Sequence, residues 1–228
     1  MVDLTQFRKS HLTAPVFWAR ALKAADGLTG SDINRSSHRP DVKALYEEVL
    51  PVAFLVRHLD IPGRRVRCRY LGGDNPCDAS IQLSGRRVAP DGFEQPFCWV
   101  EVTSAQFAKE HLRREALGRY GTVFGDPDIH TTGSPHHGNR EVISEAVTRD
   151  GTAPVDDACL WVRKAVARKA TKTYPEPCLL VVRILPERDF RWSEWLRILG
   201  EVPLEAVRDV FHDVYLVDQW TGRVFPVG

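Results

Sequence analysis

The stretch from residue 42 to 59 carries the clearest helical pattern in the chain. Its apolar residues are three or four positions apart, the spacing of one helical face: Val42, Leu45, Val49, Val52, Val56 and Leu59. Pro51 lies within this run, so the pattern predicts that the helix either kinks there or begins again. A shorter helix is expected over 14–26. The turn-forming segment 27–40 then separates an N-terminal extension, 1–40, from the main domain, 41–228.

Other segments have the patterns of strands or of further helices. Residues 65–72, RVRCRYLG, alternate apolar and basic side chains, which is typical of a strand with one solvated face. More strands are expected at 77–83, 97–103, 178–185 and 213–218. More helices are expected near 105–119, 140–148, 155–173 and 192–210. Residues 121–139 are rich in glycine and histidine and are predicted to form a loop.

Composition and charge restrict the class of protein. With 31 Lys+Arg against 30 Asp+Glu in 228 residues, no overall basic field indicates nucleic-acid binding, so any site for a polyanion has to be local. The five cysteines are odd in number and widely spaced, which predicts reduced core residues and a cytoplasmic location. No window of ~18 apolar residues and no signal-peptide pattern is present, so we expect no membrane partner.

Two of the expected strands contain a carboxylate among apolar residues. Asp78 lies in PCDASIQL and Glu101 lies in CWVEVTSA. Charge is costly in a buried strand unless a cation or hydrogen bonds compensate it, so one interpretation is a metal site. Strand alternation places Glu101 on the same face as Thr103, while Val100 and Val102 face the other way. The alternative is that Asp78 serves as a turn or capping residue and Glu101 pairs with an arginine.

The order of the expected elements resembles the core of a known superfamily. Helix 42–59, three strands, helix 155–173 and strand 178–185 are similar in order to the restriction-endonuclease-like, or PD-(D/E)xK, nucleases. The resemblance covers roughly residues 42–185. It implies an α/β fold in which helices flank a mixed central sheet, with extensions at both ends of the chain.

The motif residues of that superfamily have counterparts in this sequence. The family carries an Asp at the start of the second strand and a Glu or Asp, any residue, then Lys on the third. Here Asp78 follows Pro76 with one residue between them, and Glu101 is followed by Val102 and Thr103. Thr103 therefore stands where the family has its lysine. This departure leaves open a second function, a pseudo-nuclease that binds nucleic acid or protein without cleaving it.

The resemblance implies a Mg²⁺- or Mn²⁺-dependent phosphodiesterase that acts on DNA. Its metal ligands would be Asp78, Glu101 and a backbone carbonyl near Val102, because Mg²⁺ prefers a few carboxylate oxygens together with water. Many family members carry a further acid on the first helix that completes the metal shell, which makes Glu48 a candidate metal ligand. At ~100° per residue, Glu48 falls beside the apolar stripe and can reach inward, whereas Glu47 should be solvated. The alternative for Glu48 is an ordinary surface position.

Helix 155–173 offers a replacement for the missing lysine. Its apolar stripe runs through Val155, Cys159, Val162 and Val166, and the next position in the series is Lys169. The catalytic lysine can lie on this helix in the superfamily. Lys169 is therefore a candidate for orienting water or stabilising charge on phosphate, alongside Thr103 itself. The alternative is a lysine that snorkels to water at the helix end.

The same helix presents a second basic face. Lys164, Arg168 and Lys172 recur every four residues, a spacing suited to contacts with phosphates. They also suit the negative end of the helix dipole, so this pattern has a structural explanation as well.

Further basic residues favour a nucleic-acid partner. The segment 64–69, RRVRCR, and the pair Arg86 and Arg87 add positive charge near the proposed site. No interleaving of aromatic and basic residues indicates a platform for single strands. A homodimer is compatible with the sequence.

The histidines of the predicted loop do not indicate zinc. The spacing of His130, His136 and His137 matches no structural or hydrolytic zinc pattern. The interpretation we adopt is a loop that overhangs the site and contacts substrate.

Overall fold

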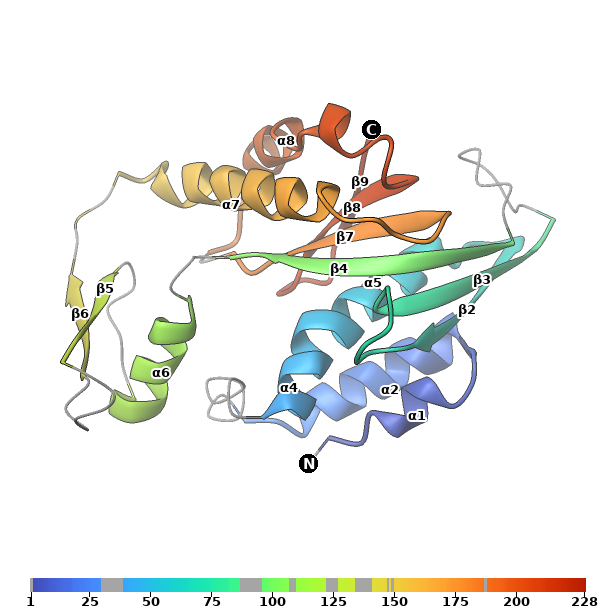
Figure 1. The fold of residues 1–228 in the computed structure, drawn as a ribbon, viewed down its shortest axis with the longest axis horizontal. Coiled ribbons are helices and arrows are strands. Elements are labelled where there is room, and N and C mark those ends of the chain that lie inside the picture. Colours follow the sequence, from blue (N-terminus) through green and yellow to red (C-terminus); the bar gives the residue numbers. More distant parts are fainter. Residues whose placement is uncertain are drawn as a thin grey trace.

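A mixed seven-stranded sheet forms the centre of the protein and lies between two layers of helices (Figure 1). This computed structural model describes residues 2–29, 39–86, 96–106, 110–121, 127–133, 141–146, 148, 150–186 and 188–228. The strand order is β1-β2-β3-β4-β7-β8-β9. The pairs β4–β7 and β7–β8 are parallel, and the other neighbours in the sheet are antiparallel. The expected α/β class with a mixed sheet is confirmed.

The elements have the following bounds. The strands are β1 (Leu12–Thr13), β2 (Arg64–Tyr70), β3 (Ala79–Gly85), β4 (Phe97–Ala105), β5 (Pro127–Thr132), β6 (Glu141–Ala146), β7 (Cys178–Ile184), β8 (Asp213–Asp218) and β9 (Val224–Val227). The helices are α1 (Thr5–Arg8), α2 (Ala14–Asp26), α4 (Pro40–Ala44), η2 (Leu45–Val49), α5 (Leu50–Leu59), α6 (Glu110–Tyr120), α7 (Ala153–Ala170), α8 (Trp192–Gly200) and η4 (Leu204–Ala206).

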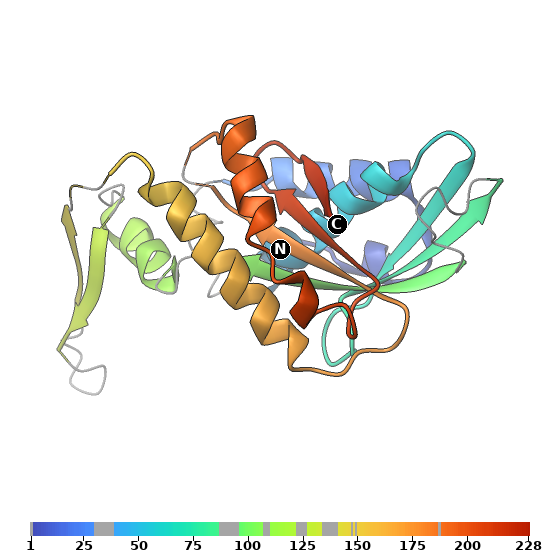
Figure 2. The same cartoon turned by 90° about the horizontal axis from the view of Figure 1, so that it is seen from above.

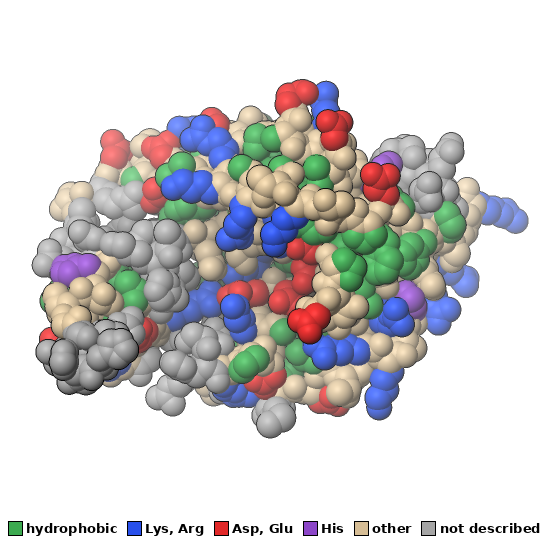
Figure 3. Space-filling view, viewed as in Figure 1, with side chains coloured by type: hydrophobic (Ala, Val, Ile, Leu, Met, Phe, Trp, Pro, Cys, Tyr) green, Lys and Arg blue, Asp and Glu red, His purple; other side chains and the backbone are tan. Residues whose placement is uncertain are grey.

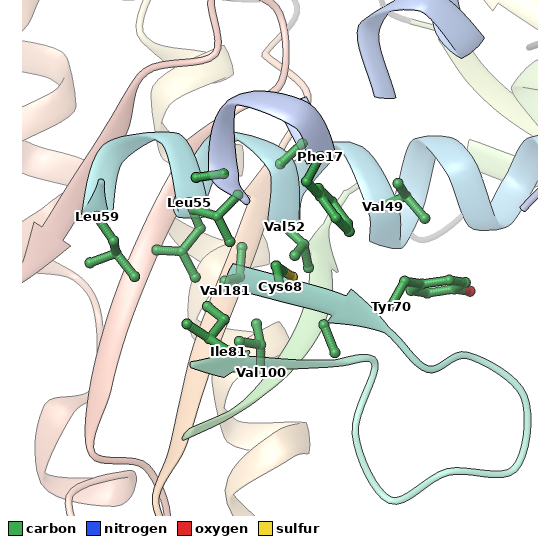
Figure 4. Close-up of a cluster of buried hydrophobic side chains, with 14 of the residues drawn as sticks. Phe17, Val49, Val52, Leu55, Leu59, Cys68, Tyr70, Ile81, Val100 and Val181 are labelled. Carbon is green, nitrogen blue, oxygen red and sulfur yellow. The ribbon is translucent and has the colours of Figure 1, made fainter. Parts of the chain in front are cut away.

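Each face of the sheet is covered by its own apolar cluster. Phe17 of α2 and Leu55 of α5 belong to the cluster that contains Val100 of β4, and Figure 4 shows these side chains meeting between helices and strands. On the other face, Val162 of α7 and Trp195 of α8 belong to the second cluster. Figure 2 shows α7 and α8 lying over the sheet on this side. The sheet is therefore buried by helices on both faces, except where strands extend beyond them.

The helical pattern from 42 to 59 is confirmed, but Pro51 has an effect that the sequence did not indicate. The helix runs through α4, η2 and α5, and η2 is a π-helical turn in which the N–H of Leu50 donates to the carbonyl of Leu45. Pro51 has no N–H for the carbonyl of Glu47, and its ring would crowd that carbonyl in a regular α-helix. The wider turn accommodates the proline without a new helix start.

Two predictions between β4 and α7 are wrong. Residues 127–132 lie in the expected loop but form β5, and residues 141–146, expected to be helical, form its antiparallel partner β6. Ile129 of β5 and Val142 of β6 are buried with residues of α6 in a small separate cluster. Cross-strand pairing and burial against α6 thus outweigh the weak helical pattern of 140–148.

The remaining differences lie mostly at the ends of elements. The helix expected over 192–210 stops at Gly200, because Pro203 does not permit a regular helix to continue. The short α1, β1 and β9 were not predicted. Phe7 of α1 and Phe17 of α2 pack edge to face, with their ring centroids 5.1 Å apart, so the N-terminal segment shares the core of the sheet. The domain boundary near residue 40 stays a prediction.

All five cysteines are buried and free, as expected. None of the described helices combines the length and the apolar character needed to cross a membrane. The cytoplasmic location stays a prediction.

Candidate functional site

The candidate site is a notch in the sheet where β4 extends beyond β3. The pairing of β4 with β3 ends at Val100 opposite Ala79, whereas its pairing with β7 continues to Ala105. This leaves a cavity of about 410 Å³, lined by Lys43, Glu47, Glu48, Asp78, Val102, Thr103, Ser104, Gln106, Arg168 and Lys169. Figure 3 shows acidic side chains gathered in a hollow near the centre of this face, with basic side chains at its rim.

Asp78 lies at the closed end of the notch, next to the first residue of β3. Its backbone N–H donates to the carbonyl of Val100 at 3.0 Å, and its carboxylate Oδ2 accepts the backbone N–H of Val102 at 2.7 Å. Burial and the nearby carboxylates of Glu101 and Glu48 raise the pKa of Asp78 to about 7, although Val102 and Lys169 act in the opposite direction. The ionised form of Asp78 thus lacks sufficient positive charge nearby, and a cation would stabilise it.

Glu101 is buried beneath the end of α7 and is paired with Lys169. The ammonium of Lys169 donates to Glu101 Oε1, and the Tyr174 hydroxyl donates to the same oxygen at 3.4 Å. The Lys169 side chain is only 13% exposed, so it does not snorkel to water. The helical spacing thus placed Lys169 correctly, and the partner of Glu101 is a lysine rather than the arginine of the alternative interpretation.

Thr103 has an arginine partner. Arg168 Nη2 donates to Thr103 Oγ1 at 2.8 Å, so this arginine reaches from the surface of α7 into the cavity. Lys164 and Lys172 are exposed and do not line the cavity. Of the three residues predicted to form a basic face, only Arg168 is directed toward β4 and lines the cavity.

The acids of the first helix both lie at the cavity, contrary to one prediction. Glu48 reaches inward as expected and accepts a hydrogen bond from the Tyr70 hydroxyl. Burial raises the pKa of Glu48, and so does the charge of Glu47 beside it. Glu47, predicted to be solvated, has a side chain that is 15% exposed and accepts a hydrogen bond from Arg114 at 3.0 Å. The prediction assumed 3.6 residues per turn, whereas both acids lie in the wider π-helical turn.

Arg183 is a buried charge that the sequence prediction missed. It lies in β7 with 2% exposure, and it donates to Ser104 Oγ and to Gln106 Oε1, each at 3.0 Å. Its Nη2 is also 3.9 Å from Glu47 Oε1. A charged residue within the apolar run CLLVVRIL gives the same signal that singled out Asp78 and Glu101, so it could have been found.

The other predicted residues lie farther away or outside the described part of the chain. Arg86 is exposed just beyond the far end of β3, and Arg87 lies outside the described residues. His130 is in β5, opposite Ile143 of β6. His136 and His137 also lie outside the described residues, so the expected contact of their loop with substrate stays a prediction.

The oxygen atoms around the notch suit a hard cation, although they do not form a complete cage. Among the described residues, no group of three or more His, Cys, Asp or Glu side chains is arranged to hold a metal ion. Val102 adds a backbone oxygen. Because its N–H points toward Asp78, strand geometry directs its carbonyl to the same side, where β3 has ended. The carboxylate of Asp78, the carbonyl of Val102 and room for water fit the preference of Mg²⁺. Glu101 does not line the cavity itself, because Lys169, which donates to Glu101 Oε1, lies between the two.

Comparisons of the chain with protein-family models, with characterised proteins and with solved structures found no match.

Proposed function

We propose that the protein is a Mg²⁺- or Mn²⁺-dependent phosphodiesterase that acts on DNA through a restriction-endonuclease-like core. One observation carries the proposal: Asp78, directly before β3, lines the notch, and Glu101 of the neighbouring strand β4 lies close enough for its charge, together with burial, to raise the pKa of Asp78. Such a pair of acids suits a divalent cation.

The topology around the notch supports the same proposal. The helix ending in α5 is followed by the antiparallel strands β2, β3 and β4, then by α7 and by β7, which is parallel to β4. This is the order of elements that the resemblance implies. The insertion formed by α6, β5 and β6 lies between β4 and α7, and Arg114 of α6 connects it to the notch through Glu47.

Asp78, Glu101 and the carbonyl of Val102 would hold the metal. A bound Mg²⁺ would polarise the phosphate and lower the pKa of a water molecule. Asp78 would give up its proton on binding the cation, because the added positive charge lowers its pKa.

The basic side chains would contact the substrate. Lys169, now donating to Glu101, would lie beside the scissile phosphate and stabilise the charge that develops on it. Arg168 lies at the mouth of the cavity, where its guanidinium can bind a second phosphate oxygen. Glu48 would support the site from behind, through its hydrogen bond with Tyr70.

A second candidate function is a pseudo-nuclease that binds nucleic acid or protein without cleavage. Lys169 and Arg168 already satisfy Glu101 and Thr103, so these two residues need no metal to be stable in the protein. This arrangement is what a binding module that has lost its catalytic lysine would have.

A cleavage assay with defined DNAs separates the two functions. Supercoiled plasmid, linear duplex, branched and single-stranded DNAs are incubated with wild-type protein in Mg²⁺, Mn²⁺ or EDTA, and Asp78→Asn serves as the matched control. The nuclease gives products only with metal and only with the wild type. Binding of these DNAs without any cleavage in either metal would favour the pseudo-nuclease, and products that persist in Asp78→Asn would contradict the proposed site.

A further inference from the structure

One face of the strands β2, β3 and β4 collects basic and aromatic side chains that are separated in the sequence. The apolar residues of these strands face α2 and α5, so strand alternation turns the intervening residues to the other side. Cross-strand pairing confirms that they share this face, since Arg69 is opposite Ser80 and Ser80 is opposite Trp99. We call this surface the open face, and it consists of Arg65, Arg67, Arg69, Ser80, Gln82, Ser84, Phe97 and Trp99.

The open face is accessible at the end away from the notch. Arg65, Arg67, Gln82 and Ser84 are exposed, whereas Arg69, Phe97 and Trp99 are half-buried and Ser80 is buried. Figure 3 shows hydrophobic and basic side chains beside one another to the right of the hollow that holds the acids. In Figure 2, α7 and α8 cross the sheet to the left of this region.

The basic side chains of the open face form one electrostatic group. Burial lowers the pKa of His11, and the nearby charges of Arg69 and Arg67 lower it further. His11 Nε2 lies 3.1 Å from Ser80 Oγ, and its carbonyl accepts a hydrogen bond from Arg67. The Nε of Arg69 is buried without a hydrogen-bond partner. The group therefore carries positive charge with no acidic side chain among the eight residues of the open face.

The open face leads directly to the candidate site. Asp78, directly before β3, precedes Ser80 by two residues, and Glu101 follows Trp99 by two residues on β4, so both acids lie at the end of this same face. From Asp78 to Ser84 the strand extends about 20 Å. A polymer bound along the exposed part of the open face would thus run toward the notch across the row of Arg69, Ser80 and Trp99.

We propose that the open face binds an unpaired nucleic-acid strand and delivers it to the notch. This inference rests on the proposed nuclease function and names its substrate class. Arginines spaced along one strand of the sheet suit a phosphate backbone. Phe97, whose ring is perpendicular to that of Trp99 with centroids 5.0 Å apart, offers an aromatic surface on which a base can stack. In a duplex the bases are already stacked on one another, so aromatic contacts favour a single strand.

Binding without cleavage tests the open face independently of the catalytic site. Fluorescence anisotropy of a labelled 15-nucleotide single strand and of the matching duplex is measured in EDTA at several salt concentrations. The variants are Arg65→Gln/Arg67→Gln and Phe97→Leu. Arg20→Gln/Arg57→Gln, on α2 and α5 in the helical layer beneath the sheet, is the control with the same loss of charge. Circular dichroism of each variant checks that it is folded.

The wild type should bind the single strand more tightly than the duplex. Arg65→Gln/Arg67→Gln should weaken binding and make the salt slope shallower by about 1.4, since each phosphate contact on a single strand contributes about 0.7. Phe97→Leu should weaken binding about fivefold or more and leave the salt slope unchanged.

Three results would overturn the inference. The first is tighter binding of the duplex than of the single strand, and the second is an equal loss of affinity in the control variant. The third is displacement of the strand by polyglutamate as readily as by unlabelled DNA, which would indicate a surface for any polyanion. EDTA prevents metal-dependent cleavage, so this experiment measures binding alone. A negative result would reject the open face as a binding surface, and the proposed phosphodiesterase activity would still be decided by the cleavage assay. Binding that depends on the open face, from a protein that never cleaves, would reject the nuclease and retain the nucleic-acid strand as ligand.

Discussion

The ammonium of Lys169 in α7 donates to the carboxylate of Glu101 in β4, across 68 residues of sequence. The pair lies beside Asp78, whose pKa is lowered by Lys169 and raised more strongly by Glu101. A lysine from the helix therefore stands close to both acids, although Thr103 occupies the position at which the nucleases that the sequence resembles have their lysine. This arrangement is the basis for proposing a catalytic role for Lys169.

Loss of the Lys169 ammonium should abolish cleavage and also lower stability. Lys169→Met keeps the apolar stem but leaves the buried Glu101 without its cation, which should reduce the free energy of unfolding by about 3 kcal/mol. In the double variant Lys169→Met/Glu101→Gln the buried charge is gone, so most of that stability should return. Urea denaturation measures both. Equal destabilisation of the single and double variants would show that the ion pair does not explain the loss.

A lysine restored at position 103 tests whether Lys169 is a migrated catalytic residue. Thr103→Lys in the Lys169→Met background should recover part of the cleavage rate, because residue 103 lines the same cavity. The matched control is Thr103→Met in the same background, which adds length without charge. Full activity of Lys169→Met alone would contradict the migrated-lysine hypothesis.

The raised pKa of Asp78 predicts a specific dependence of stability on pH. The native protein retains a proton on Asp78 up to about pH 7, whereas the unfolded chain loses it near its ordinary value of 3.8. The unfolded state thus binds fewer protons in this interval, so this residue's contribution to stability falls as the pH rises from about 4 to about 7.

Asp78→Asn removes that pH dependence and keeps an acceptor for the N–H of Val102. Its stability relative to the wild type should increase from pH 4 to pH 8 by on the order of 4 kcal/mol without metal, because each pKa unit corresponds to about 1.4 kcal/mol. Denaturant titrations at the two pH values measure the difference. A constant difference between the proteins would show that Asp78 ionises normally.

A bound metal should stabilise the folded protein through Asp78. Calorimetric titration with Mg²⁺ or Mn²⁺ should give a binding isotherm for the wild type and none for Asp78→Ala. At 100 times the dissociation constant, the metal should add about 2.7 kcal/mol to the free energy of unfolding, which a rise in melting temperature reports. Identical isotherms for the two proteins would exclude Asp78 as a ligand.

The sequence predicted those parts of the site that follow from regular geometry. Alternation on β4 placed Glu101 and Thr103 on one face, and the helical stripe of α7 placed Lys169 opposite them. Glu47 was misplaced because the π-helical turn before Pro51 departs from 3.6 residues per turn. The missing elements β5 and β6 depend on pairing with each other and on burial against α6, which local patterns do not contain.

The open face is a second feature that local sequence patterns could not predict. Arginines on β2 and the aromatic residues on β4 are about thirty positions apart, so no interleaving is visible along the chain. The register of β2 with β3 and of β3 with β4 brings them onto one surface. Such surfaces become predictable only once strand pairing is known, because register depends on contacts between distant residues.

The central claim is tested most directly by measuring two quantities for Glu101→Gln and for the wild type: the single-turnover cleavage rate and the affinity for DNA. Glutamine keeps the size of the side chain and an oxygen that can accept from Lys169, but it removes the charge that would hold the metal. We predict that cleavage falls by at least a hundredfold, about 2.7 kcal/mol of transition-state stabilisation, while the affinity for DNA in EDTA stays within about twofold. Cleavage by Glu101→Gln at the wild-type rate, or metal-dependent cleavage by neither protein across the whole set of DNAs, would contradict the claim that this notch is a phosphodiesterase site.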